Sequence, residues 1–208
     1  MASLPEAVLR TRVRRTAQRA SDAGHIVASL GNVSARHPRH DDRLLITPSG
    51  VSYGAMASAD VVTIDQGGRV HRAVGEVRPS SEWRVHAAIY RARPDVHAIV
   101  HTHAVHAQAF SFLGCPLSAD TEELDAFAGG DVDVADYAAS GTGELAENAV
   151  RALGSRQAVL LARHGVVSVG VSLDAAYAVA QVVERQAERA WRLDQATELS
   201  ASLPERGR

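Results

Sequence analysis

The stretch VHAIVHTHAVH, residues 96–106, joins an apolar run to three histidines and anchors the prediction of the fold. The run from Val96 to Val100 favours a buried strand that continues to His101. Because side chains two residues apart on a strand point to the same face, His101 and His103 would face one spot. Such a pair suits two ligands of one metal ion, but it also arises from ordinary packing, and it cannot complete a metal site alone.

Strands and helices are predicted on both sides of this stretch. The turn-rich segments HPRHDD, TPSG and DQGG separate short strands, as in an antiparallel meander: His25–Leu30, Val33–His37, Arg43–Ile46 and Val61–Ile64. Two more strands, Ala158–Arg163 and Val166–Val169, follow later. Helical periodicity marks residues 5–23, Ser80–Arg91, Ala104–Leu113, Gly143–Leu153 and about Leu173–Leu199. This order predicts an α/β fold with three α-β-α layers and a mainly antiparallel central sheet.

The composition is that of an ordinary globular protein, with 46% hydrophobic and 22% charged residues. We expect a single domain over residues 1–208, since this length is short for two. A net charge of −2 points to neither nucleic acid nor an anionic membrane. No apolar run approaches the roughly 20 residues that span a bilayer, and the N-terminus lacks the apolar core of a secretory signal. We therefore expect a cytoplasmic protein.

The absence of lysine narrows the chemistry further. It excludes a Schiff-base lysine, the usual kind of pyridoxal-phosphate enzyme and a Walker A loop. The single cysteine, Cys115, excludes an internal disulfide and a multi-cysteine metal site. Any carbanion chemistry would need another electron sink, for which a metal ion is the obvious choice.

His164 is the candidate for a third metal ligand. It follows the apolar segment AVLLAR and precedes Gly165, a residue that lets the backbone turn or approach a ligand closely. Catalytic zinc sites commonly use three protein ligands and leave one position open for substrate. His106 belongs to the helix that follows the first two histidines, and we expect it to be structural.

The segment RPSSEWRVH, residues 78–86, supplies a candidate base and candidate anion donors. Ser80 or Ser81 could simply cap the following helix, or could bind phosphate together with free backbone N–H groups. Glu82 follows directly, where a carboxylate could serve as general base. The loops GNVS and TPSG add glycines, an amide and hydroxyls that suit a small anion: Gly31, Asn32, Ser49 and Gly50.

Five motifs in one order carry a family resemblance: GNVS at 31–34, TPSG at 47–50, PSSE at 79–82, HTHAVH at 101–106 and RHG at 163–165. In this order and spacing, over roughly residues 5–190, the chain resembles the class II aldolase/adducin family. The resemblance implies the layered fold of that family and a metal-dependent aldehyde-lyase. It also implies a homotetramer, for which the arginine-rich first helix and the long last helix offer surfaces.

The resemblance assigns a role to each candidate residue. His101, His103 and His164 would bind Zn²⁺, with Mn²⁺ or Co²⁺ as alternatives, and Glu82 would be the acid–base residue. The substrate phosphate would lie against Gly31, Asn32, Ser49, Gly50, Ser80 and Ser81. The implied reaction is reversible aldol cleavage of a small phosphorylated ketose, such as L-fuculose 1-phosphate or a deoxypentulose 1-phosphate, to dihydroxyacetone phosphate and an aldehyde.

One difference from the family's residues and several alternative functions bear on the prediction of an aldolase. Aldolases of the family carry a tyrosine at the aldehyde end of the site, where this chain has Glu122 with Glu123 beside it. Dehydratases and decarboxylases of the superfamily share the histidines, whereas the related epimerases carry Asp at the position of Glu82. Non-catalytic adducin-like modules lack the metal ligands. Retention of the histidines therefore favours an enzyme, with an aldolase as the leading prediction.

Overall fold

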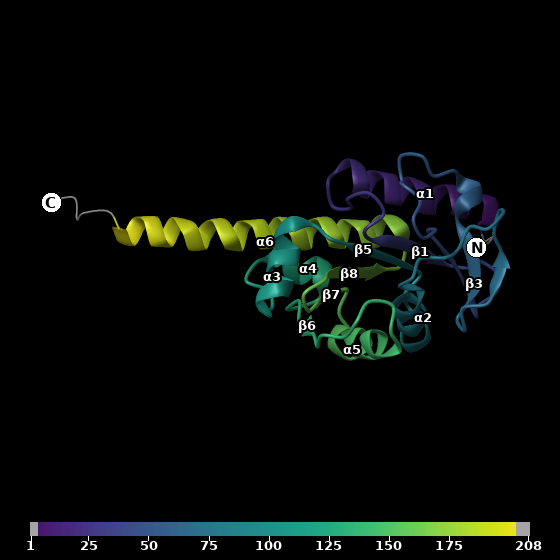
Figure 1. The fold of residues 1–208 in the computed structure, drawn as a ribbon. Helices are drawn as coiled ribbons and strands as arrows, with labels where there is room; N and C mark the ends of the chain where they lie inside the picture. The colour runs from purple at the N-terminus through teal and green to yellow at the C-terminus, as the bar shows by residue number, and fades with distance from the viewer. Residues whose placement is uncertain (1–3, 203–208) are drawn as a thin grey trace.

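The computed structural model describes residues 4–202, whose centre is an eight-stranded sheet (Figure 1). Its strands lie in the order β4-β3-β2-β1-β5-β8-β7-β6, and each neighbouring pair is antiparallel except β6 and β7. Their bounds are β1 Asn32–Arg36, β2 Arg43–Ile46, β3 Val62–Asp65, β4 Val70–Arg72, β5 Ala98–Thr102, β6 Val134–Ala135, β7 Ala158–Leu161 and β8 Gly165–Gly170. The predicted mainly antiparallel sheet is confirmed.

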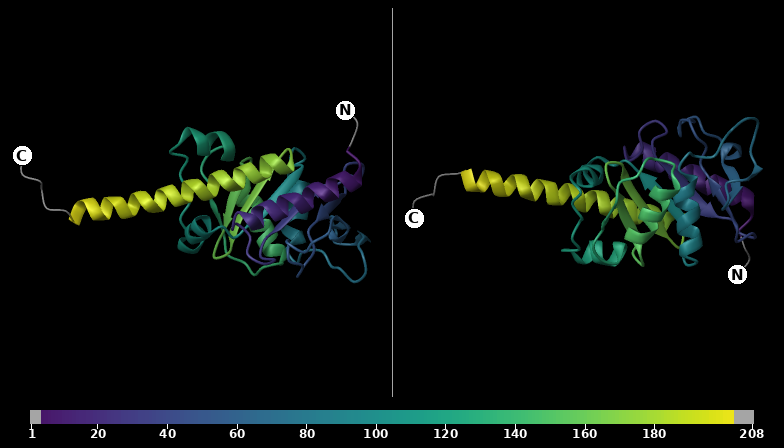
Figure 2. Two further views of the ribbon diagram at one scale, coloured as in Figure 1. Left: turned by 90° about the horizontal axis from the view of Figure 1, so that it is seen from above. Right: turned by 60° about the horizontal axis from the view of Figure 1, so that its bottom comes forward.

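Helices cover both faces of the sheet and complete the three predicted layers (Figures 1 and 2). Helices α2 and α5 share one apolar core with the sheet, and α1 and the start of α6 share a second core on the opposite face. A third core joins α3 and α4 to α6 and to strands β7 and β8. The helices are α1 Glu6–Asp22, a 3₁₀ turn η1 Ser58–Asp60, α2 Trp83–Ala92, α3 Val105–Leu113, α4 Glu122–Ala128, α5 Gly143–Leu153 and α6 Leu173–Ser202.

Strand β5 lies in the middle of the sheet and is buried on both faces. Ile99 packs into the core under α2 and α5, whereas Ala98 and Val100 pack into the core under α1 and α6. Since side chains alternate along a strand, His101 shares the face of Ile99. The alternation thus directs His101 toward α2.

The start of α2 differs from the prediction. The helix begins at Trp83, with Glu82 as its N-cap residue and no side-chain cap, so capping by Ser80 or Ser81 is wrong. The Ser80 N–H donates to the carbonyl of Thr47 at 3.0 Å, which ties Ser80 to the neighbouring loop. The Ser80 hydroxyl accepts the N–H of Glu82 at 3.3 Å, one residue before the helix begins. By contrast α5 spans the predicted residues, because the Thr142 hydroxyl accepts the N–H of Leu145 at 3.2 Å and caps it.

Residues 25–30 do not form the predicted strand. This segment is a turn closed by an isolated bridge between Val27 and Leu30, and Ala28 has a φ of +55°. A backbone in the left-handed region cannot continue a strand. Three short elements, β4, α4 and β6, were not predicted, because two or three strand residues or two helical turns carry little periodic signal.

Helix α6 runs well past the rest of the molecule (Figure 2). In its C-terminal half, Trp191 and Leu193 have exposed fractions of 46% and 52%, and the Trp191 ring centroid lies 5.7 Å from that of His106 on α3. Within residues 4–202, no helix is both long and apolar enough to cross a membrane.

Candidate active site

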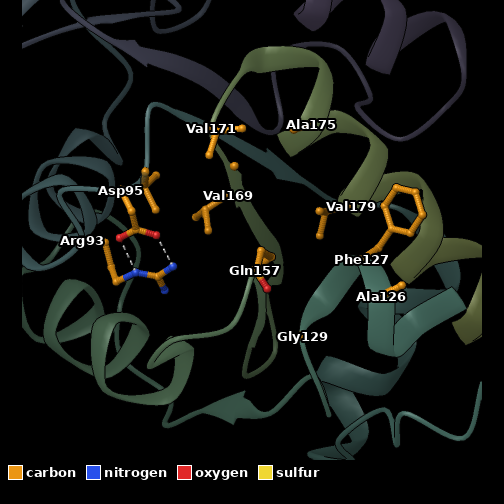
Figure 3. Close-up of a pocket in the computed structure, with 12 residues that line it drawn as sticks. Arg93, Asp95, Ala126, Phe127, Gly129, Gln157, Val169, Val171, Ala175 and Val179 are labelled. Atoms are coloured by element: carbon orange, nitrogen blue, oxygen red, sulfur yellow. Dashed lines mark hydrogen bonds and ion pairs between the residues drawn. The ribbon is translucent and has the colours of Figure 1, made fainter. Parts of the chain in front are cut away.

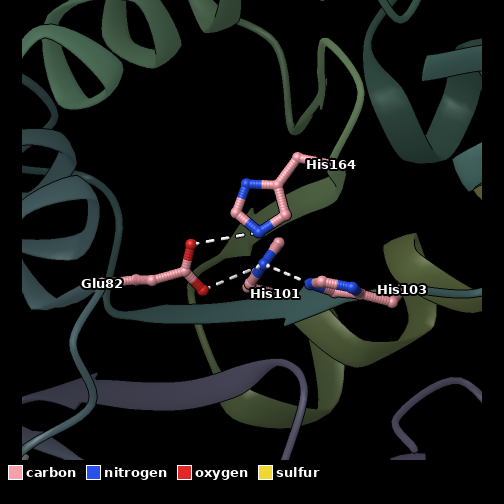
Figure 4. A group of neighbouring side chains, drawn as sticks. All are labelled: Glu82, His101, His103 and His164. Atoms are coloured by element: carbon pink, nitrogen blue, oxygen red, sulfur yellow. Dashed lines mark hydrogen bonds and ion pairs between the residues drawn. The ribbon is translucent and has the colours of Figure 1, made fainter. Parts of the chain in front are cut away.

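Glu82 and three histidines converge where β5, β8 and the start of α2 meet (Figure 4). One ligand-type atom from each of Glu82, His101, His103 and His164 lies within 4.8 Å of the others. The three imidazole rings are mutually edge-on, with centroids 4.9 Å apart in each pair. The structure therefore brings together the four residues that the sequence proposed for metal binding and acid–base chemistry.

The position of the first two histidines follows from the end of β5. The Nδ1–H of His101 donates to the carbonyl of Val166 on β8 at 2.9 Å, because a carbonyl can only accept. This bond leaves Nε2 of His101 facing the cluster, 3.1 Å from Nε2 of His103. The backbone N–H of His103 donates to the carbonyl of His25, so the chain has left the sheet at that residue. Both rings nevertheless point to one spot, as the sequence predicted.

The position of His164 depends on its neighbours in the β7–β8 turn. Arg163 has a φ of +57°, a left-handed conformation that turns the chain sharply after β7. Gly165 packs directly on β5, since a Cβ there would lie less than 3.0 Å from the carbonyl oxygen of Thr102. The turn and the close approach together place His164 beside His101 and His103.

Charge and burial set the protonation states of this cluster. Burial would raise the pKa of Glu82, but the charges of His101 and His164 and the hydrogen bonds it accepts lower it well below its usual range. Burial, followed by repulsion from the neighbouring rings, lowers the pKa of His103 to about 3. Burial and the charge of His101 lower the pKa of His164 to about 4. His103 and His164 are thus neutral near pH 7, as metal ligands must be. Burial would lower the pKa of His101, but the charge of Glu82 and the hydrogen bond to it raise that pKa, so a cation that binds His101 competes with a proton.

These four residues fit a divalent cation. Three imidazole nitrogens and one carboxylate match the donor set of zinc and similar ions. The Nδ1–H bond of His101 to a backbone carbonyl is the outer contact that commonly orients a metal-binding imidazole. An ion held by the three rings would keep one side open toward the adjoining pocket.

A pocket of about 280 Å³ adjoins the histidines. Glu82, His103 and His164 form part of its wall. All six residues that the sequence proposed for phosphate line the same pocket, although they come from three separate segments: Gly31, Asn32, Ser49, Gly50, Ser80 and Ser81. The structure thus brings candidate metal ligands and candidate phosphate donors into the wall of one small cavity.

Ser140 belongs to this pocket and was not identified from the sequence. Its hydroxyl donates to Oε1 of Glu82 at 2.9 Å, and the residue precedes the cap of α5. A lone serine in the segment AASGTG carries no motif of its own, so only its contact with Glu82 reveals it.

Three other sequence candidates lie elsewhere. Glu123 forms an ion pair with Arg185 on α6, and neither Glu122 nor Glu123 lines the pocket. Within one chain their predicted role at the aldehyde end therefore receives no support. His106 bonds through Nδ1 to Glu184 at 2.8 Å, away from the cluster, in line with the structural role expected for it.

A second, larger cavity lies at the far end of β8 (Figure 3). It measures about 500 Å³ and is lined mainly by apolar side chains such as Phe127, Val171 and Val179. Its charged pair, Arg93 and Asp95, is already joined by two hydrogen bonds. The cavity therefore offers no free acid, base or metal ligand, and the smaller pocket is the better candidate for chemistry.

The fold and the site define a layered α/β enzyme with a candidate metal centre, and comparison with known proteins places it in a family. Residues 11–191 match the family described as Class II Aldolase and Adducin N-terminal domain. The chain is 42% identical over 156 residues to an L-fuculose phosphate aldolase of Escherichia coli O157:H7, covering 75% of this chain and 70% of the relative.

Two further proteins that are similar to this chain are also named as aldolases. A 5-methylthioribulose-1-phosphate/5-deoxyribulose-1-phosphate aldolase of Rhodospirillum rubrum is 41% identical over 170 residues, covering 82% of this chain and 74% of the relative. A solved structure of an L-fuculose 1-phosphate aldolase matches with a TM-score of 0.85 at 34% identity, covering 99% of this chain and 93% of the other. The chain therefore belongs to the class II aldolase and adducin family, and its similarity is to the aldolases, which are lyases.

Proposed function

We propose that the protein is a metal-dependent aldolase that reversibly cleaves a small ketose 1-phosphate to dihydroxyacetone phosphate and an aldehyde. One observation carries the proposal: the Glu82 and histidine cluster opens on a pocket that also contains every candidate phosphate donor. The substrate class is suggested by relatives named for L-fuculose phosphate and for 5-methylthioribulose and 5-deoxyribulose 1-phosphates.

In this proposal His101, His103 and His164 hold the cation, and Zn²⁺ is the ion that three imidazoles and an open position favour. The bound cation supplies the Lewis acid that polarises the ketose carbonyl, in a chain without a lysine to form an iminium. Val166 orients His101 through its carbonyl, and Gly165 keeps β8 close enough for His164 to take part.

Glu82 is the proposed acid–base residue. Its carboxylate lies 3.2 Å from the Nε2 atoms of both His101 and His164, on the side of the histidines that faces the pocket. When the C3–C4 bond breaks, the C4 hydroxyl loses its proton as it becomes the aldehyde carbonyl, and Glu82 delivers a proton to the carbon that becomes C3 of dihydroxyacetone phosphate. In the direction of synthesis it removes that proton.

Neutral groups are proposed to bind the phosphate. The pocket wall contains neither arginine nor lysine, so the donors within reach of an anion are the hydroxyls of Ser49, Ser80 and Ser81 and the backbone N–H groups of Gly50 and Ser81. The backbone N–H groups of Ser49 and Ser80 already donate to the carbonyls of Arg78 and Thr47. Loops of this kind bind phosphate through their dipoles. Gly31 completes the wall, where a Cβ would come 2.7 Å from the carbonyl oxygen of His101.

We propose further that the protein acts as a homotetramer, as the family resemblance implies, and a cytoplasmic location stays a prediction. The C-terminal half of α6, where Trp191 and Leu193 are exposed, provides surface for contact between copies. Mass photometry of the purified protein tests the assembly, and a monomer at micromolar concentration would contradict it.

The reaction is tested with the zinc-loaded protein and a panel of ketose 1-phosphates that includes the L-fuculose, 5-deoxyribulose and 5-methylthioribulose compounds. Release of dihydroxyacetone phosphate is measured by a coupled reductase assay. We expect release from at least one of them. No release from any, together with dehydration or decarboxylation of a related sugar, would rule out the aldolase.

A further inference from the structure

The two oxygens of the Glu82 carboxylate have different partners. Oε2 accepts from Nδ2 of Asn32 at 2.9 Å and faces Nε2 of His101 at 3.2 Å. Oε1 accepts from the hydroxyl of Ser140 at 2.9 Å and faces Nε2 of His164 at 3.2 Å. Each oxygen therefore has one histidine partner and one neutral donor.

The histidine partners cannot hold the carboxylate once a cation is bound. A ring nitrogen that gives its lone pair to a metal carries no proton to donate. Asn32 and Ser140 are then the remaining side chains within hydrogen-bond distance of Glu82 among the described residues. Apart from the cation itself, these two side chains orient the base in the loaded enzyme.

Asn32 and Ser140 differ in what they can do when Glu82 gains a proton. The amide nitrogen of Asn32 donates to Oε2, and Asn32 could accept a bond from Oε2 only if its whole buried amide flipped. A hydroxyl both donates and accepts, so Ser140 can turn and accept a bond from a protonated Oε1. Asn32 is 1% exposed and lies within β1, whereas Ser140 is exposed and lines the pocket. The hydroxyl of Ser140 can then direct its own proton to solvent or substrate.

The position of Ser140 is fixed although it lies in a loop. Gly141 has a φ of +77°, and a Cβ there would lie 3.0 Å from the carbonyl oxygen of Ser81. The carbonyl of Gly141 accepts from Nη1 of Arg84 on α2 at 3.1 Å, and Thr142 caps α5. Contacts on both sides thus hold Ser140 against the residue before α2.

We propose that Ser140 is a positioning residue that holds the Glu82 carboxylate through Oε1 in the orientation needed for proton transfer during turnover. The inference rests on the proposed function, because it requires Glu82 to be the acid–base residue. Glu82 exchanges the proton with the substrate carbon, and Ser140 keeps its own proton and forms or breaks no covalent bond.

The kinetic test compares Ser140→Ala with Ser140→Thr, which keeps the hydroxyl, and uses the exposed Ser155→Ala as the matched control. For Ser140→Ala we expect kcat to fall about 10- to 100-fold, the effect of losing one charge-assisted hydrogen bond. We expect KM within about twofold of the original value and unchanged metal stoichiometry. Ser140→Thr should regain most of kcat, and Ser155→Ala should match the unmodified protein.

A second measurement does not depend on substrate. In a double-mutant cycle with Glu82→Ala, Ser140→Ala should lower Tm by about 2–6 °C when Glu82 is present and by much less when it is absent. Equal shifts in both backgrounds would overturn the inference whatever the activity. So would an unchanged kcat in Ser140→Ala, or a kcat in Ser140→Thr as low as in Ser140→Ala.

The two proposals fail in different ways. If the unmodified protein cleaves no ketose 1-phosphate while the Tm coupling persists, the proposed function fails, and the proposed role of Ser140 in turnover fails with it. If cleavage is normal and the coupling or the kcat loss is missing, only the role of Ser140 is overturned.

Discussion

Gly165→Ala tests whether the close approach of β8 to β5 assembles the metal site. An added Cβ would lie less than 3.0 Å from the carbonyl oxygen of Thr102 and about 3.2–3.3 Å from ring carbons of His103 and His101. An ordinary carbon–oxygen contact is about 3.3 Å or more, so the two strands must separate by several tenths of an ångström. That movement would carry His164 away from its partners.

The expected size of the effect follows from overpacking. Inserting a methyl group into a filled site costs about 1–3 kcal/mol, which for a chain of this length lowers Tm by about 2–12 °C. Displacing one ligand of a three-histidine site should also weaken metal binding about 10- to 100-fold. Thermal unfolding with and without added zinc, and a competition titration with a chelating dye, measure the two effects separately.

Gly143→Ala is the matched control. Gly143 is the first residue of α5, and a Cβ there would meet no atom within 4 Å. Since alanine favours the helix more than glycine, the control should keep metal affinity and hold or raise Tm. Gly165→Ala with unchanged Tm and unchanged metal affinity would refute the reasoning, because the methyl group would then fit without moving the strands.

Three further predictions concern single side chains. Elemental analysis should show that His164→Ala loses stoichiometric metal. His106→Ala should keep the metal, because His106 bonds to Glu184 instead of the cluster. Metal retained at full stoichiometry in His164→Ala would mean that the third ligand lies elsewhere. Glu82→Gln should abolish turnover yet largely keep the metal, since an amide cannot take up a proton but the imidazoles remain; normal turnover would remove the carboxylate from the mechanism. The pKa of Glu6 is lowered: burial alone would raise it, but the hydrogen bond to Arg10 and the charge of that residue outweigh burial. The folded protein therefore binds fewer protons at Glu6 than the unfolded chain does. The stability that this pair contributes is present above the ordinary carboxyl pKa and is lost as pH falls, and Glu6→Gln should therefore flatten the decline of Tm in acid; an identical decline in both proteins would contradict this.

The sequence determined the elements whose signals are local. Helical periodicity, with acidic residues early and Arg151 late, predicted α5 to the residue, and the turns around Arg43–Ile46 did the same for β2. The sequence also predicted that His101 and His103 face one spot, although β5 ends at Thr102 and the strand repeat on which the prediction rested does not extend to His103. Order and spacing of five short motifs were sufficient to identify the family.

Local signals failed where tertiary contacts took precedence. The apolar residues around Val27 read as a strand, yet Ala28 turns the chain there and no neighbouring strand pairs with it within the described residues. Ser80 read as a helix cap, yet its N–H pairs with Thr47 across a loop that lies beside it only in the folded chain.

The site itself needed the tertiary structure. His164 lies more than sixty residues after His101, and nothing local places β8 beside β5; that order follows from burial of both strands in the middle of the sheet. Ser140 has no motif, and its contact with Glu82 arises because Gly141 lets the loop pack on the start of α2. Sequence patterns thus determined which side chains could act. Packing of segments distant in the chain decided which of them meet, because distances between such segments depend on the whole core and not on neighbouring residues.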